Sequence, residues 1–113
     1  MAVKPIVASL VYQRDMYQCV HCGTTDGLSL QHRINRQMGG SKSRDTVQNL
    51  IVMCWDANMR LESSAGFAER GMAAGWKLRS WQDPLAVPVL YAPEGAFFVL
   101  TESGARVRVT EAP

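Results

Sequence analysis

The sequence predicts a single α+β domain that begins with a helix and ends in a meander of short strands. A chain of 113 residues has room for one hydrophobic core, and its 47% hydrophobic content is enough to build a modest one. Helix-like and strand-like segments follow one another, separated by turns rich in glycine and proline. The charged fraction of 19% is typical of neither a disordered chain nor a coiled coil.

The first half of the chain is predicted to contain one helix and two strands. Apolar residues fall near one face between residues 5 and 18, and Pro5 suits a first helical turn, so this segment is expected to be helical. Residues 28–34 alternate apolar and polar side chains, which indicates a strand. A polar, glycine-rich loop over residues 35–48 leads to a continuous apolar run at residues 50–54, which indicates a second strand.

The second half is predicted to contain a long helix followed only by short strands. Helix-forming residues return from 56 to 74. Beyond that point Asp83-Pro84 and Pro88 interrupt any further helix. The predicted strands span residues 76–79, 87–91, 96–101 and 106–110, and the turns between the last three span residues 93–95 and 102–104.

The charge distribution is more informative than the net charge of +2. The segment 31–44 carries four positive residues and no acidic one; these are Arg33, Arg36, Lys42 and Arg44. Such a segment is either a solvated loop or a surface that contacts phosphates. No apolar run approaches the ~18 residues of a membrane span, and no signal peptide is recognisable at the N-terminus. These features predict a cytoplasmic protein without a membrane partner.

The cysteine content favours a metal site over a disulfide. The chain has three cysteines, an odd number, whereas small secreted domains are usually held together by disulfide bonds between paired cysteines. The Cys19-Val20-His21-Cys22 segment has the spacing of a metal-binding turn or of its remnant.

An ordered set of motifs resembles the HNH endonuclease family, the treble-clef (ββα-metal) nucleases. The set consists of Cys19-x-x-Cys22, Leu30-Gln31-His32-Arg33, Gly39-Gly40, Asn49-Leu50, Cys54 and Asn58. The closer likeness is to small HNH proteins encoded by bacteriophages. Those proteins continue, as this chain does, with Glu62-Ser63, Gly75-Trp76-x-Leu78, Asp83-Pro84 and Val87-Pro88-Val89.

The resemblance implies a fold and an activity. It implies a ββα-metal core over residues 14–75 and a β extension over residues 76–113, within one domain that cleaves DNA with a divalent cation in the infected cell's cytoplasm. His32 matches the general base, and its ordinary pKa near 6.5 suits that role. Asn49 matches the residue that organises the loop. Gln31 and Asn58 match the metal-side positions, and the basic residues named above would face the DNA backbone.

The chain departs from the family at both metal sites. Asn58 stands where the family usually has histidine, and Gln31 where it often has histidine or aspartate. Two neutral amides suit weakly held Mg²⁺ or Mn²⁺ rather than a metal that prefers imidazole. At the structural zinc site Cys19, Cys22 and Cys54 match three thiolates, but the fourth position is Ala57.

Two questions therefore stay open at this stage. Zinc is either held by three thiolates with water or Asp56, or lost, with the cysteines packed in the core. His21 is expected to point outward. The alternatives to a nuclease are a DNA-binding module that has lost cleavage and a protein that acts with the phage DNA-packaging machinery through its C-terminal strands.

Overall fold

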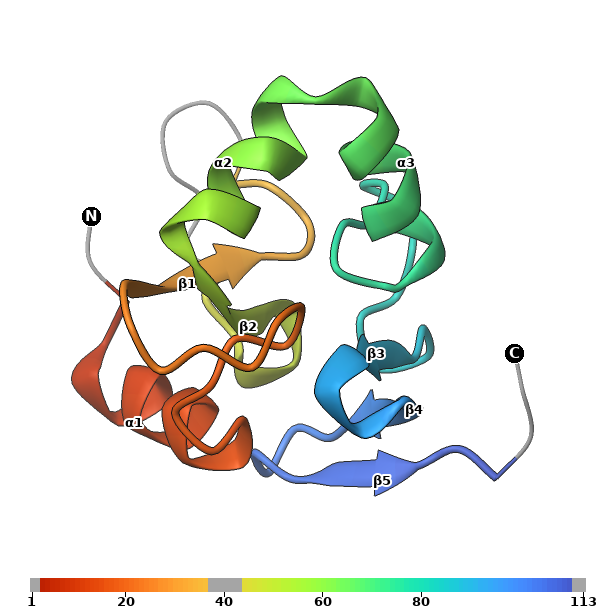
Figure 1. Ribbon diagram of the computed structural model, residues 1–113. Helices are drawn as coiled ribbons and strands as arrows, with labels where there is room; N and C mark the ends of the chain where they lie inside the picture. The colour runs from red at the N-terminus through yellow and green to blue at the C-terminus, as the bar shows by residue number, and fades with distance from the viewer. Residues whose placement is uncertain (1–2, 37–43, 111–113) are drawn as a thin grey trace.

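The computed structural model describes residues 3–36 and 44–110. In these residues the chain is an α+β fold with three α-helices and two small antiparallel sheets (Figure 1). The elements in chain order are α1 (Pro5–Arg14), β1 (Leu28–His32), the 3-10 turn η2 (Val47–Asn49), β2 (Leu50–Cys54), α2 (Trp55–Ser63), α3 (Ala65–Ala73), β3 (Val89–Tyr91), η3 (Ala92–Glu94), β4 (Ala96–Leu100) and β5 (Arg106–Arg108). None of the helices in the described ranges is long and apolar enough to cross a membrane.

The hairpin of β1 and β2 separates two hydrophobic cores. Leu28 pairs with Cys54 at one end of the hairpin and His32 pairs with Leu50 at the other. Residues of β2 point alternately to the two faces. Leu50 and Val52 pack against α1, whereas Ile51 and Met53 pack with α2, α3 and the C-terminal sheet. Each residue of β1 faces the same side as its partner on β2, so β1 also presents alternate side chains to the α1 side and to the α2 side. The second strand is confirmed at its predicted bounds, and the first ends two residues early.

The first helix ends at Arg14 rather than at Gln18, where the sequence predicts its end. Met16 and Tyr17 both have positive φ angles, of 59° and 53°, which no helix continues. The cause is the buried side chain of Asp15, which accepts a hydrogen bond from the Val52 N–H (3.0 Å). The chain turns at this point because the carboxylate is tied to the central hairpin.

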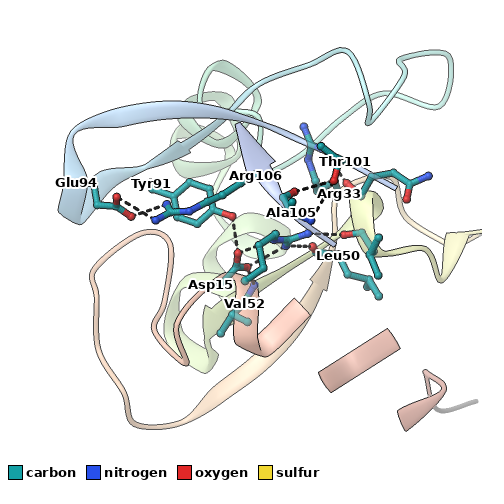
Figure 2. A network of polar contacts seen from close by, with 12 residues as sticks. Asp15, Arg33, Leu50, Val52, Tyr91, Glu94, Thr101, Ala105 and Arg106 are labelled. Atoms are coloured by element: carbon teal, nitrogen blue, oxygen red, sulfur yellow. Dashed lines mark hydrogen bonds and ion pairs between the residues drawn. The ribbon is translucent and has the colours of Figure 1, made fainter. Parts of the chain in front are cut away.

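A buried polar network joins α1 to the hairpin and to the C-terminal sheet (Figure 2). Asp15 pairs with the Arg14 guanidinium (2.8 Å) and accepts a hydrogen bond from the Tyr91 hydroxyl. Arg14 also donates to the carbonyl oxygens of Val47 (2.7 Å) and Leu50 (2.6 Å). These bonds satisfy the buried charges and fix the segment in which η2 meets β2.

The long helix predicted over residues 56–74 is two helices in the structure. Ser64 has an extended backbone conformation, and its hydroxyl accepts a hydrogen bond from the Phe67 N–H (3.3 Å). Serine is a favourable N-cap, so it ends α2 and starts α3 in one position. The two helices approach closely at Gly71, where the lack of a side chain leaves room for Leu61. A Cβ at Gly71 would lie only 2.4 Å from Cδ2 of Leu61.

The C-terminal meander is confirmed, and the strand predicted at residues 76–79 is wrong. Strands β3, β4 and β5 pair in order, and tight turns follow β3 and β4. Residues 76–79 form no strand, although the Leu78 N–H donates to the Arg33 carbonyl (2.7 Å). Gly75 precedes this segment with φ +77°, and a Cβ there would meet the Pro88 oxygen at 2.0 Å. The segment therefore connects α3 to the C-terminal sheet, bound to Arg33 at Leu78 and packed against Pro88 at Gly75.

Candidate functional site

His32, the predicted general base, lies at the last position of β1 and contacts a carboxylate. Its Nε2 is 2.7 Å from Oδ1 of Asp45, and its side chain is 22% exposed. Arg36 binds the same carboxylate, with Nε 2.9 Å from Oδ1 and Nη2 on Oδ2. A histidine, an acid and an arginine thus meet where the strand ends.

The charge state of Asp45 determines which nitrogen of His32 is basic. The hydrogen bond from Arg36 lowers the pKa of Asp45 below its ordinary value, and the bond from His32 acts in the same direction. An ionised carboxylate only accepts hydrogen bonds, so Nε2 of His32 is the protonated nitrogen. In the neutral ring, Nδ1 is then the basic atom, and it has no hydrogen-bond partner within residues 3–36 and 44–110.

Asn49 holds together the two ends of the loop that follows β1. Its Oδ1 accepts from the Ile34 N–H (2.8 Å), and its Nδ2 donates to the carbonyls of Ile34 (3.0 Å) and Arg44 (2.9 Å). Only 2% of Asn49 is exposed, so these bonds are made away from competing water. The side chain has the bonding pattern that the predicted loop-organising role requires.

Gln31 lies on the face of the hairpin that packs against α2, and Asn58 of α2 contacts the same face. Gln31 pairs with Ile51, which faces α2, whereas His32 pairs with Leu50, which faces α1. The Gln31 amide nitrogen donates to the His32 carbonyl (2.8 Å), and the Asn58 amide nitrogen donates to the Ser29 hydroxyl (3.0 Å). The structure therefore brings these two amides to one face, with nitrogens engaged and oxygens left as candidate ligands. It directs His32 to the other face.

Arg33 is not placed to contact DNA, which corrects the sequence-based expectation. It is 0% exposed, and its guanidinium donates to four backbone carbonyls. These are Gly75 (2.8 Å), Gln48 (2.9 Å), Pro84 (2.9 Å) and Val87 (2.7 Å). Burial lowers the pKa of Arg33 to about 10, so it is still a cation at neutral pH. Its role is to join the loop before β2 to the segment that leads into the C-terminal sheet.

The other basic residues of the predicted DNA surface have different environments. Arg36 is half-buried and engaged by Asp45. Arg44 is half-buried, and its carbonyl is bound by Asn49. Lys42 lies outside the described residues, as do Gly39 and Gly40.

A second group of chemically active side chains lies at the other end of the hairpin. Ligand atoms of Cys19, His21 and Cys22 all lie within 4.8 Å of one another, so this Cys–His–Cys group could hold a metal ion such as zinc. Cys54 adjoins it, with its Sγ 3.9 Å from that of Cys22. We call these four residues the Cys/His cluster.

His21 points inward, contrary to the prediction that it faces solvent. Its ring makes edge-on contacts with the rings of Phe67 (5.1 Å between centroids) and Trp76 (5.3 Å). Burial, followed by the charges of Arg60 and Arg70, lowers the pKa of His21. The imidazole is therefore neutral at neutral pH, which is the form that binds metals. Burial raises the pKa of Cys19 to about 11, so metal binding there displaces a proton.

Asp45 and the orientation of His21 were missed in the sequence analysis. Asp45 is the single acid between residues 27 and 55 and directly follows the basic segment, which is a signal that could have identified it. No such local signal exists for His21, since Phe67 and Trp76 are distant in sequence.

Comparison with known proteins identifies no relative: no family model, no curated protein and no solved structure matches this chain.

Proposed function

We propose that this protein is a metal-dependent DNA endonuclease of the HNH type, with β1, β2 and α2 as its ββα-metal core. The observation that carries the proposal is the contact of 2.7 Å between His32 and Asp45 at the end of β1. A histidine whose Nε2 is held by a carboxylate has its ring orientation and tautomer fixed and its Nδ1 available as a base. Asn49 supports this arrangement by tying the adjacent loop.

His32 would act on the water that attacks the scissile phosphodiester. Its Nδ1 would take the proton from that water, and the Asp45 carboxylate would stabilise the imidazolium that results. Arg36 keeps Asp45 ionised for this role. The proton would afterwards be returned to solvent, since His32 is partly exposed.

The oxygens of Gln31 and Asn58 are the candidate ligands for the cation. Mg²⁺ or Mn²⁺ bound there would stabilise the negative charge on the phosphate and on the leaving oxygen. Both amide nitrogens are used in hydrogen bonds, which orients the two groups on the same face. Neutral oxygen donors fit a hard cation, but without a carboxylate they hold it weakly until the substrate phosphate adds its own oxygens.

A DNA-binding module without cleavage, including one that serves phage packaging, is the second candidate. It is favoured by the placement of Gln31, which is 3% exposed and lies on the opposite face of β1 from His32. In such a module the basic loop, which carries Arg36, Lys42 and Arg44, would still bind DNA. The His32–Asp45 contact would then only stabilise this loop.

Replacing Asp45 tests the proposal directly. Asp45→Asn should lower the kcat of plasmid nicking in Mg²⁺ by about 10–100-fold, with little change in KM, because an amide holds the imidazole less firmly and cannot balance its charge. Asp45→Glu should recover part of the rate. Asp26→Asn, at an exposed acid before β1, is the control and should keep the parental rate. An Asp45→Asn protein as fast as the parent would contradict the proposed role of the pair.

The basic loop is expected to supply salt-dependent affinity for duplex DNA. Lys42→Ala should lower the slope of log affinity against log salt concentration by about one, because one phosphate contact is lost. Fluorescence anisotropy of a labelled duplex measures the slope, and Arg108→Ala, at an exposed position on β5, is the control. A parental slope in Lys42→Ala together with a reduced slope in Arg108→Ala would place the DNA surface on the C-terminal sheet instead.

A further inference from the structure

We propose that His21 is the fourth ligand of a closed zinc site whose other ligands are the thiolates of Cys19, Cys22 and Cys54. In this site an imidazole takes the place of the thiolate that is missing at Ala57. The three residues of the Cys19–Cys22 turn present ligand atoms within 4.8 Å of one another, and Cys54 brings its sulfur to 3.9 Å from that of Cys22. Zinc with three sulfur ligands and one nitrogen ligand is a common structural site.

The distance between the Cys22 and Cys54 sulfurs fits tetrahedral coordination. With Zn–S bonds of about 2.3 Å and a Zn–N bond of about 2.0 Å, neighbouring sulfurs lie about 3.8 Å apart, and a sulfur and a nitrogen about 3.6 Å apart. The Sγ atoms of Cys22 and Cys54 are 3.9 Å apart, which is near this value. Within the Cys19–Cys22 turn the ligand atoms need to move by about 1 Å at most, since they all lie within 4.8 Å of one another. Cys54 is positioned by its sulfur contact with Cys22 and would complete the tetrahedron by moving toward His21.

The Nδ1 atom of His21 is a buried polar atom that lacks a partner. Among the described residues no donor or acceptor contacts it. A buried nitrogen without a hydrogen bond destabilises the fold, so an unpartnered nitrogen on a ring that is grouped with the sulfurs of Cys19 and Cys22 indicates a ligand. The edge contacts of Phe67 and Trp76 hold the ring in place, so that little freedom is lost on coordination.

The sulfurs already receive hydrogen bonds of the kind that stabilise thiolates. The backbone N–H of His21 donates to Cys19 Sγ, and the backbone N–H of Ala57 donates to Cys54 Sγ, both at 3.4 Å. Such donors favour the charged form of sulfur, which is the form that binds zinc. Asp56, the competing fourth ligand, is 79% exposed and pairs with Arg60 at 3.6 Å. Its carboxylate is thus exposed to solvent and engaged by another side chain.

A zinc ion here would brace parts of the chain that are distant in sequence. It would join the turn before β1 to the start of α2, and through the His21 ring it would support α3 and Trp76. Four protein ligands leave no open position for water, so the ion would be structural and would take no part in cleavage.

The test is the zinc content and zinc affinity of the full chain. The parent should contain one zinc per chain by elemental analysis. His21→Ala should bind zinc at least about tenfold more weakly in a chelator competition, because a direct ligand matters at least as much as the groups that orient ligands. His32→Ala changes the chain's other histidine and should keep parental zinc affinity. Zinc content is measured without DNA, so the outcome is independent of cleavage.

A spectroscopic measurement keeps the proposal falsifiable if His21→Ala does not fold. Long-range ¹H–¹⁵N correlation spectra of the zinc-loaded parent should show the Nδ1 resonance of His21 at a metal-bound position, and Co²⁺ substitution should give the intense absorption of a tetrahedral site with three thiolates. An unligated His21 ring, parental zinc affinity in His21→Ala, or a parent that binds no zinc would each overturn the proposal.

Discussion

Replacing His32 by alanine should reduce the rate of plasmid cleavage by about 10²–10⁴-fold, the usual effect of losing a general base. His32 is the histidine that Asp45 holds at the end of β1, and its Nδ1 is the basic atom that the proposed reaction needs. The fold should persist, because Arg36 still pairs with Asp45 in the variant and the side chain is not part of either core. The initial rate of nicking in Mg²⁺ measures the effect.

DNA affinity and the circular dichroism spectrum are the controls for His32→Ala. Both should match those of the parent, since the basic loop and the hydrophobic cores are unchanged. Cleavage at the parental rate would show that another group is the base. A loss of cleavage accompanied by a lost spectrum would mean that His32 acts on the fold instead.

Replacing Arg33 by methionine should lower the free energy of unfolding by about 3 kcal/mol or more, and the Tm by about 10 °C or more. Methionine has a similar length but no donors, so four backbone carbonyl oxygens, all buried or partly buried, lose their partner together. Thermal unfolding followed by circular dichroism measures the change. Arg108→Met, at an exposed position, should stay within about 0.5 kcal/mol of the parent.

The same variant distinguishes the structural role of Arg33 from the DNA contact expected from sequence alone. A DNA contact predicts weaker binding with unchanged Tm, because an exposed arginine contributes little to stability. The buried guanidinium predicts the reverse. A stable Arg33→Met protein with reduced DNA affinity would contradict the arrangement described here.

The strands that form were predictable because their signals are local, whereas the strand predicted at residues 76–79 does not form. The apolar run that became β2, and the glycine-containing turns after β3 and β4, depend on neighbours in sequence. The errors come from distant contacts. Helix α1 stops early because Asp15 binds Val52 and Tyr91. The break at Ser64 did have a local signal, a serine that caps the next helix, but the surrounding helix-forming residues concealed it.

His32 and Asn49 of the candidate site were predictable, but Asp45 and the directions of several side chains were not. His32 and Asn49 lie where a strand end and its loop would need them. Arg33 and His21 point inward because most of their partners come from segments about 40 to 55 residues away in the chain, which no local pattern reveals. Burial of a charged or polar side chain is decided by whether such partners exist.

Nicking of supercoiled plasmid by the purified full chain tests the central claim most directly. The protein is incubated with Mg²⁺, with Mn²⁺ and with EDTA, beside the His32→Ala variant. We predict open-circular product with millimolar Mg²⁺ or Mn²⁺, none with EDTA, and almost none with His32→Ala. A parent that shifts the plasmid on a gel but produces no open circles with either cation would contradict the endonuclease assignment and support the DNA-binding module instead.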